Sequence, residues 1–295
     1  MLVQVRAAGL DRGTWHLMTG TPSVVRLAIG LRRPRNPVPG RDVAGIVAAV
    51  GSAVTTLSVG DEVYGVAPGS FAEYAVTRAD KLARKPASLS FEEAAVVPIS
   101  GLTALQALTA GGVKAGQRVL IIGASGGVGS YAVQLAKALG AEVTGVASGP
   151  KLDLVRSLGA DHVIDYTSED FAETADRFDV ILDIAGNPSL SRLRRALTST
   201  GTAVITGGED GRGPTGGMNR QLRGLILSVF VRQRFPFFLS SESGTDLERL
   251  TGLIEAGSVV PSLDRTYPLD ETQDAMRRLA SGAVRGKLAI TIASA

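Results

Sequence analysis

Short apolar segments separated by turn residues make up the first part of the chain. They read LVQVRAA (2–8), AGIVAAVG (44–51), DEVYGV (61–66) and FAEYAVT (71–77). In the first segment Gln4 and Arg6 alternate with apolar residues, which is typical of a strand with one buried face. Turn residues, such as Gly60-Asp61, stand between the later segments. The pattern predicts a β-rich region.

After about residue 90 the pattern changes to alternating strands and helices. The apolar segment RVLII (118–122) is followed by a helical stripe of Val128, Tyr131, Ala132, Leu135, Ala136 and Leu139. Further strands are expected at 142–146, 162–165, 178–184, 202–207 and 287–292, and helices at 151–158, 189–197 and 244–256. This alternation predicts an α/β fold with a parallel, doubly wound sheet.

The segment between Gly207 and Ser243 has no clear period. It begins with GGEDGRGPTGG, which we interpret as a flexible loop, and continues into the apolar run LILSVFV (225–231). This run is well short of the roughly 18 residues that a spanning helix needs. Arg223, Arg232 and Arg234 flank it. A membrane-surface role is one interpretation, but we favour a covered loop or a subunit contact, because charged flanks on short apolar runs are common.

The amino-acid composition excludes several kinds of site and partner. The 295 residues suffice for two domains, and 44% hydrophobic with 20% charged residues argues against disorder. The chain has no cysteine and two histidines, which excludes disulfides, a cysteine nucleophile and a three-histidine zinc site. The net charge of +3, without a basic run interleaved with aromatics, argues against nucleic acid. No secretory signal pattern is visible, so we expect a cytoplasmic protein.

The segment GASGGVG (123–129) lies between a predicted strand and a predicted helix. Glycine lets backbone N–H groups approach a diphosphate at the helix N-terminus. We expect Gly126 and Gly127 to make the turn and the close approach, and Gly129 to let the helix pack on the strand. Ser125 replaces the second glycine of the common G-x-G-x-x-G pattern. The segment predicts a dinucleotide site; the alternative is a plain tight turn.

The end of the second predicted strand bears on the choice of cofactor. An NAD site wants a carboxylate there for the ribose 2′-hydroxyl, whereas a 2′-phosphate needs hydroxyls and cations. Residues 146–151 contain no carboxylate, and Ser148 and Lys151 are both able to bind phosphate oxygens. This favours NADP over NAD. Lys151 would alternatively be a solvated residue in the first turn of the next helix.

Several further motifs match one family in order and spacing. They are AAGLDRGTWHLMTG (7–20), PGRDVAGIVAAVG (39–51), VGDEVYG (59–65), GSFAEYAV (69–76), PISGLTALQAL (98–108) and LGADHVIDY (158–166). With GASGGVG they make the chain resemble the medium-chain dehydrogenase/reductase superfamily, in its zinc-free quinone oxidoreductase branch. The resemblance implies a GroES-like β domain (1–92 and 262–295) and a Rossmann domain (93–261), with NADPH in the cleft between them.

The resemblance also assigns roles to residues of the cofactor site. For Thr103 the alternative is a helix cap or turn, and for Tyr166 it is a half-buried aromatic at a strand end. The implied positions are Thr103 near the nicotinamide, Ser125, Gly126, Gly127 and Val128 at the diphosphate, and Ser148, Lys151 and Tyr166 at the 2′-phosphoribose.

The first domain departs from the family in three ways. Zinc-dependent relatives carry a cysteine before residues 7–20 and a His-Glu pair where this chain has Arg41-Asp42, so the comparison implies a metal-free site. Many relatives have an Asn where this chain has Asp11 and an Asp near Thr14, and we expect Asp11 and Thr14 in the substrate pocket. Asp11 would alternatively form a turn before Arg12-Gly13. Relatives also begin earlier, with a hairpin, so we expect an open sheet edge that a partner covers or that lowers stability.

These features together predict NADPH-dependent reduction of a quinone or an α,β-unsaturated carbonyl by hydride transfer, without a metal. Two alternatives remain open. The first is an NADPH-binding protein with an incomplete substrate domain. The second is an enoyl reductase module of a larger synthase, which is disfavoured because residues 19–25 (TGTPSVV) lack the tyrosine acid of thioester-reducing relatives. The resemblance further implies a homodimer.

Overall fold

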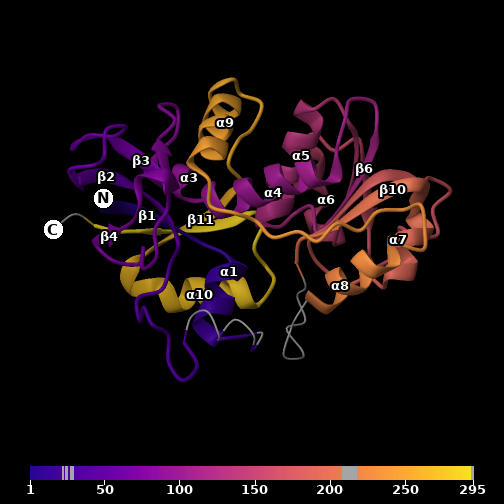
Figure 1. Cartoon of the computed structure of the whole chain (residues 1–295), viewed down its shortest axis with the longest axis horizontal. Coiled ribbons are helices and arrows are strands. Elements are labelled where there is room, and N and C mark those ends of the chain that lie inside the picture. Colours follow the sequence, from indigo (N-terminus) through magenta and orange to yellow (C-terminus); the bar gives the residue numbers. More distant parts are fainter. Residues whose placement is uncertain (22, 24–25, 27–29, 208–217, 294–295) are drawn as a thin grey trace. The chain divides into compact units, whose positions relative to one another are not determined.

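The computed structural model describes residues 1–21, 23, 26, 30–207 and 218–293. The chain divides into two compact units, which we call unit 1 (Met1–Leu102 with Ser241–Ala295) and unit 2 (Thr103–Ser240). Figure 1 shows the elements of both. The glycine-rich stretch GGEDGRGPTGG, expected to be a flexible loop, lies mostly outside the described residues.

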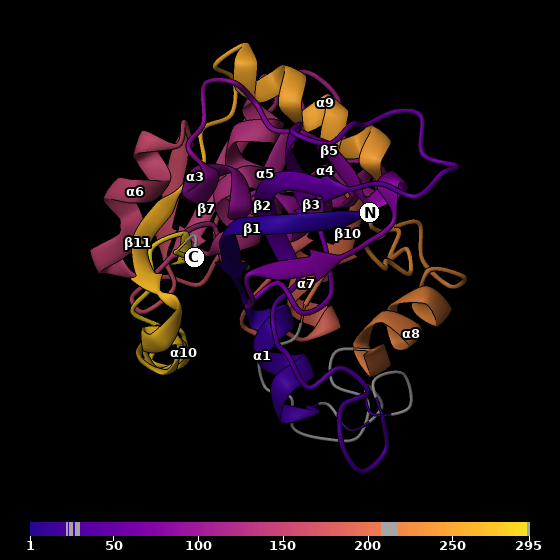
Figure 2. The ribbon, with the colours of Figure 1, turned by 90° about the vertical axis from the view of Figure 1, so that its left-hand side faces the viewer.

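Unit 1 is built on a seven-stranded sheet in the order β11-β12-β1-β2-β3-β5, with β4 paired to β1. Figure 2 shows β1, β2 and β3 side by side. Val3 and Val5 of β1 face the core and Gln4 is less buried, as the alternation predicted. The strands are β1 (Leu2–Leu10), β2 (Asp42–Ala49), β3 (Glu62–Val66), β4 (Tyr74–Val76), β5 (Leu82–Arg84), β11 (Leu263–Pro268) and β12 (Lys287–Thr291).

The first strand is not an edge. Leu2–Gln4 pair with β4 and Ala7–Leu10 pair with β12, while β2 runs along the other side. The expectation of an open edge at the start of the chain is therefore wrong for this strand. The reason is that a segment from the chain's end, β12, and a segment from its middle, β4, share the same side of β1.

The α-helices of unit 1 differ in length, from five residues in α3 (Phe91–Ala95) to 12 in α9 (Gly244–Glu255). The sequence did not predict α1 (Arg12–Thr19), which begins where Asp11 accepts a hydrogen bond from the Thr14 N–H. The capping box of α3 joins Ser90 and Glu93 in the same way. The remaining helices are α10 (Thr272–Ala280) and α4 (Pro98–Gly111), which runs across the boundary between the units.

The unit boundaries differ from the expected domains. They fall at 102/103 and 240/241 rather than at 92/93 and 261/262, so α9 belongs to unit 1. The Tyr64 hydroxyl of β3 donates to the Leu247 carbonyl of α9 over 2.8 Å and lies 2.9 Å from the Thr251 hydroxyl. Leu247 and Leu250 are buried. These contacts hold α9 against β3. A local pattern in the sequence does not indicate this packing.

Unit 2 is a five-stranded parallel sheet in the order β10-β9-β6-β7-β8. All of Val119–Ile122 in β6 is buried, as expected for a strand covered on both faces. The chain moves outward from β6 in one direction and then returns to its other side at β9. The elements are β6 (Arg118–Ile122), α5 (Gly127–Ala138), β7 (Glu142–Ala147), α6 (Leu152–Ser157), β8 (His162–Asp165), β9 (Phe178–Asp183), α7 (Leu190–Ala196), β10 (Leu197–Ile205) and α8 (Met218–Leu227).

The expected α/β class and the parallel sheet are thus confirmed. The helical stripe of α5 is buried at Tyr131, Ala132, Leu135 and Ala136, whereas Leu139, just past the helix, is exposed. Among the helices within the described ranges, none is long and apolar enough to cross a membrane.

Candidate functional site

The glycine-rich segment 123–129 joins β6 to α5 at the carboxyl edge of the parallel sheet. Gly123 has a φ of 89°, and its N–H donates to the Val146 carbonyl over 3.1 Å. The Gly126 N–H then donates to the Gly123 carbonyl, also over 3.1 Å. No side chain caps α5 at Gly126. The first N–H groups of this helix have no intrahelical acceptor, which is the arrangement that binds phosphate groups.

Two glycines of this loop have different physical roles. A Cβ on Gly129 would lie 2.1 Å from the Gly123 oxygen and 2.7 Å from Cα of Ala124, so only glycine fits. A Cβ on Gly126 would have only the Gly123 oxygen within 4 Å, at 3.5 Å. Gly129 therefore allows the helix to pack on the turn, while the position of Gly126 is open apart from the ordinary contact with the Gly123 oxygen and leaves room for a ligand.

Ser148, Lys151 and Tyr166 lie at the ends of two neighbouring strands. Ser148 follows β7, and the Lys151 N–H donates to the Ser148 carbonyl over 2.8 Å. The Tyr166 N–H donates to the Ala147 carbonyl over 3.2 Å, while its ring is 62% exposed. The structure thus brings these three predicted residues to the same edge of the sheet as the glycine loop.

Asp165 lies at this strand end too, and the sequence reasoning missed it. Its backbone pairs with Ala147 in the β7–β8 register, and a Cβ on Gly149 would lie 2.7 Å from its Oδ2. The Thr167 N–H and hydroxyl donate to Oδ1 over 3.0 and 2.7 Å. These bonds, with the Gly149 N–H, hold the pKa of Asp165 below its ordinary value. Residues 146–151 contain no carboxylate, but strand pairing brings Asp165, at the end of the next strand, to the same place.

Asp183 ends β9, directly beside the end of β6. Its backbone is in register with Ile122, so it lies at the point where the strand order reverses, which is where ligands bind in doubly wound sheets. Its Oδ2 pairs with the Arg220 guanidinium of α8, which also donates to Asn187 Oδ1 over 2.9 Å. Oδ1 of Asp183 is buried and has no partner among the described residues. Burial, opposed by Arg220, raises the pKa of Asp183 to about 6.

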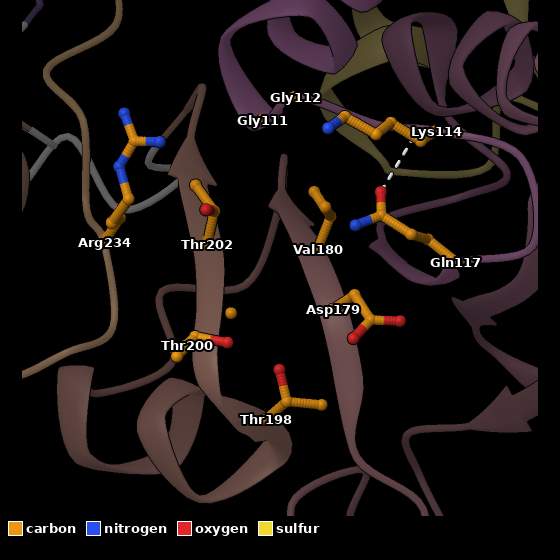
Figure 3. A pocket seen from close by; sticks show the side chains of 11 residues that line it. Gly111, Gly112, Lys114, Gln117, Asp179, Val180, Thr198, Thr200, Thr202 and Arg234 are labelled. Carbon is orange, nitrogen blue, oxygen red and sulfur yellow. Dashed lines mark hydrogen bonds between the residues drawn. The ribbon is translucent and has the colours of Figure 1, made fainter.

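A hollow of about 270 Å³ lies at the opposite edge of the same sheet (Figure 3). The Lys114 N–H donates to Gln117 Oε1 there over 2.8 Å. The whole of β6 separates this hollow from the glycine loop. Its lining residues are Gly111, Gly112, Lys114, Gln117, Asp179, Val180, Thr198, Thr200, Gly201, Thr202 and Arg234.

Unit 1 contains a buried cluster of three charged side chains. Lys287 Nζ of β12 lies 2.9 Å from Asp42 Oδ2 and 3.4 Å from Asp11 Oδ2. The other oxygens are also engaged: Asp11 Oδ1 accepts from the Thr14 N–H over 2.7 Å, and Asp42 Oδ1 accepts from the Ile99 N–H over 2.8 Å. Asp11 is thus a helix cap and an ion-pair partner of Lys287.

Burial and the neighbouring charges shift the pKa values of the two carboxylates of this cluster in opposite directions. Burial raises the pKa of Asp42 to about 6, because repulsion from Asp11 adds to it and Lys287 only partly offsets it. Burial acts on Asp11 as well, but Lys287, the Thr14 N–H and Arg41 together hold its pKa below the ordinary value. Asp42 is therefore the member of this pair that takes up a proton first as the pH falls.

The other two predicted site residues, Thr14 and Thr103, lie in helices. Thr14 lies in α1 and is buried, and its hydroxyl oxygen has no hydrogen-bond partner in the described part of the chain. An unpaired buried hydroxyl is costly, so it is a natural contact for a bound molecule. Thr103 lies in α4 and is partly buried.

Arg41 and Asp42, which stand where zinc-dependent relatives carry a His-Glu pair, do not fit a zinc site. Arg41 pairs with Glu242, and Asp42 is held by Lys287 and Ile99. Zinc prefers nitrogen and sulfur ligands in a tetrahedral set. Within the ranges that the structure describes, no three His, Cys, Asp or Glu side chains are grouped to hold a metal ion.

Three family profiles match this sequence. The alcohol dehydrogenase GroES-like domain matches residues 1–87 and the zinc-binding dehydrogenase family matches 158–290. The C-terminal domain of alanine dehydrogenase/PNT matches 99–188. The mitochondrial NAD(P)H oxidoreductase RTN4IP1 of Mus musculus is 36% identical over 278 residues, which cover 86% of this chain and 70% of that protein. The chain belongs to the medium-chain dehydrogenase/reductase superfamily.

Other members of the superfamily agree with this placement. The 2-methylene-furan-3-one reductase of Solanum lycopersicum is 36% identical over 271 residues, covering 87% of this chain but only 64% of that enzyme's length. The quinone oxidoreductase structure from Coxiella burnetii has a TM-score of 0.86 at 30% identity, covering 99% of this chain and 90% of that chain. A mycobacterial structure, Rv1454c complexed with NADPH, has a TM-score of 0.81 at 26% identity, covering 99% and 90%.

Proposed function

We propose that this chain is an NADPH-dependent oxidoreductase that reduces a quinone or an α,β-unsaturated carbonyl by hydride transfer, without a metal. The observation that carries the proposal is the carboxyl edge of the unit 2 sheet. An uncapped helix N-terminus, an open space at Gly126 and the residues Ser148 and Lys151 lie at this edge. The relatives named for quinone and enone reduction support the reaction type.

In this proposal the residues of the loop hold the cofactor's diphosphate. Ser125, Gly127 and Val128 offer backbone N–H groups and the positive end of the α5 dipole, and Gly126, whose N–H is held by the Gly123 carbonyl, leaves the space beside them open. Bound NADPH would supply the hydride from its nicotinamide ring. We assign Thr103 to the nicotinamide end of the site.

Ser148, Lys151 and Tyr166 hold the 2′-phosphoribose in the same proposal. A serine hydroxyl and a lysine ammonium are charge-assisted partners for phosphate oxygens. The exposed ring of Tyr166 is available for stacking or for a hydroxyl contact. The mycobacterial neighbour crystallised with NADPH supports this choice of cofactor.

For the substrate we retain Asp11 and Thr14 as pocket residues. The unpaired buried hydroxyl of Thr14 supports its place there. Asp11 already caps α1 and pairs with Lys287, so we propose that it positions Thr14 rather than moving a proton. A quinone needs little acid assistance because conjugation stabilises the reduced oxygen. The absence of cysteine from the sequence and the engaged Asp42 support a metal-free reaction.

We further propose the two-domain organisation of the superfamily, with a GroES-like part and a Rossmann part whose limits are close to units 1 and 2. A homodimer and a cytoplasmic location remain predictions of the sequence.

The test is reduction with NADPH that carries deuterium at C4 of the nicotinamide. A small quinone and a small enone are offered separately, and the products are analysed by mass spectrometry and NMR. We expect consumption of NADPH with both, and deuterium on the β-carbon of the saturated ketone. Cofactor binding by fluorescence without turnover on a broad panel would instead favour a binding protein with an incomplete substrate domain.

A further inference from the structure

The helix α8 (Met218–Leu227) has its apolar stripe on the outside. Leu222, Leu225, Ile226 and Val229 have the i, i+3, i+4, i+7 spacing that normally faces a core, yet they are 46 to 79% exposed. The inward contacts are made by Gly224 and by the partly buried Leu227, which packs against the core of unit 2. A Cβ on Gly224 would lie only 2.9 Å from the Cβ of Phe235. The helix therefore packs through these two residues and turns Leu222 and Leu225 outward.

The apolar surface continues beyond the helix. Phe230 is 79% exposed and Leu239 is 82% exposed, and Phe237 is exposed as well. Figure 1 draws α8 in orange, below the sheet of unit 2. We call Leu222, Leu225, Ile226, Val229, Phe230, Phe237 and Leu239 the apolar surface of α8. The Phe238 N–H donates to Gln221 Oε1 of α8 over 2.9 Å, so the segment of Phe237 and Leu239 lies beside the helix. An exposed apolar surface of this kind is typical of an interaction site. The sequence interpretation as a covered loop is therefore wrong for Val229 and Phe230.

The charged side chains of the segment that carries this surface have one sign. Between Asp210 and Glu242 the sequence contains arginines and no lysine, aspartate or glutamate. Arg220 is turned inward to Asp183, whereas Arg223, Arg232 and Arg234 are exposed. The backbone of Arg234 is fixed beside β10, because its N–H donates to the Gly201 carbonyl and its carbonyl accepts from the Ala203 N–H, both over 2.9 Å.

We propose that the apolar surface of α8 docks on a membrane surface of anionic lipids. Leucine and phenylalanine side chains would enter the boundary between headgroups and acyl chains, and the arginines would meet lipid phosphates. A two-fold contact of this surface with itself would satisfy the apolar groups, but it would bring arginines together with no carboxylate from the same segment to compensate. Charge complementarity therefore selects the anionic lipid surface over a second copy. The inference does not depend on the proposed reduction.

The test uses the full chain and two kinds of vesicle, one of phosphatidylcholine alone and one of phosphatidylcholine mixed equally with phosphatidylglycerol. Co-sedimentation is measured at low and at high salt. We expect binding to the anionic vesicles that falls at least about ten-fold at high salt, because the arginines contribute through screened charge. We expect little binding to the neutral vesicles.

Three variants separate the contributions of apolar and arginine side chains to vesicle binding. Phe230→Asp should abolish binding to anionic vesicles, and Arg232→Gln should weaken it about five-fold. Val59→Asp is the matched control, because Val59 is also an exposed apolar residue (62% exposed) but lies in unit 1. This substitution should leave vesicle binding unchanged. Thermal unfolding of each variant checks that it folds; if Phe230→Asp does not, Leu239→Ser replaces it.

Two results would overturn the proposal. One is an absence of binding to anionic vesicles, and the other is equal binding to both kinds of vesicle. Light scattering of the same samples identifies the alternative: a dimer of the wild type that Phe230→Asp converts to a monomer, without vesicle binding, would assign this surface to a second copy.

Discussion

The two edges of the parallel sheet in unit 2 differ in a way that separates a binding site from a hollow. The carboxyl edge has a tight glycine turn, a helix N-terminus without a cap and the side chains of Ser148 and Lys151. The amino edge has a hollow of about 270 Å³ lined by threonines, Lys114 and Arg234. Open volume is present at the amino edge, whereas the glycine turn and the N-terminus of α5 bring backbone donors together at the carboxyl edge.

Strand polarity explains the difference. In a parallel sheet every strand–helix turn at the carboxyl edge leads into a helix N-terminus, so N–H groups and positive dipole ends gather there. At the amino edge helices end, and their carbonyl groups gather instead. Backbone chemistry is therefore a better guide to an anion site in this sheet than the size of a hollow. The following predictions test that contrast, from the largest expected effect to the smallest.

Gly129→Val should have the largest effect. Its Cβ would lie 2.1 Å from the Gly123 carbonyl oxygen and 2.7 Å from Cα of Ala124, and both of these are backbone atoms that cannot move aside. We expect a loss of more than about 3 kcal/mol of unfolding free energy and no detectable NADPH binding. Chemical denaturation and fluorescence titration measure the two.

The control for this variant is Gly252→Ala in α9, where a Cβ meets nothing within 4 Å. It should stabilise unit 1 by about 1 kcal/mol. A Gly129→Val protein that is as stable as the wild type and binds NADPH would show that α5 does not need glycine at this position.

Asp183→Asn should change the pH dependence of stability. The pKa of Asp183 is about 6 in the folded protein and 3.8 as its ordinary value, so the folded state binds this proton more tightly. The wild type therefore loses stability as the pH rises from about 4 to 6, and the variant does not lose this part. We expect the stability difference to shift in favour of the variant by roughly 2 kcal/mol over that window.

Urea denaturation of both proteins at several pH values measures this shift. The buried Asp42 cluster titrates in the same range, but it is common to both proteins and cancels in the difference. A shift in favour of the wild type would mean that Arg220 outweighs burial, and that the ion pair at the switch point stabilises the ionised carboxylate.

Lys151→Ala should weaken NADPH binding about ten-fold and leave NADH binding unchanged, because only NADPH carries the 2′-phosphate. Arg156→Ala is the matched control: Arg156 lies in the last turn of the following helix, α6, where it is exposed and pairs with Asp153. Isothermal titration at two salt concentrations provides the affinities. Equal weakening for both cofactors would remove Lys151 from the phosphate site.

Lys114→Ala at the amino edge should have the smallest effect. The side chain lines the hollow, a full strand length from the glycine loop. We expect less than about a two-fold change in NADPH affinity, within the error expected for a distant site. A large loss of affinity would break the contrast between the two edges and make the hollow part of the cofactor site.

The sequence predicted the parts of the fold that depend on local period. RVLII coincides with β6, and FDVILDI contains β9, because continuous apolar runs are typical of buried parallel strands. The motif order also predicted the superfamily. Helix α1 was missed because its N-cap, Asp11, stands before Arg12-Gly13, which reads equally well as a turn.

The charged groups of both units were not predictable from local pattern. Lys287 lies 276 and 245 residues from its partners Asp11 and Asp42, and strand pairing alone brings them together. Arg220 and Asp183 are 37 residues apart and meet only because α8 packs back on the sheet. Asp165 was missed for the same reason. It belongs to β8, and the pairing of β8 with β7 brings it beside the end of β7.

The most direct test of the central claim is the ratio of kcat/KM for NADPH and NADH, measured on the full chain with one quinone and one enone. The Ser148 and Lys151 pair at the carboxyl edge predicts a preference for NADPH of about ten-fold or more with both acceptors. Equal values for the two cofactors, or a preference for NADH, would contradict the assignment of this edge to a 2′-phosphate.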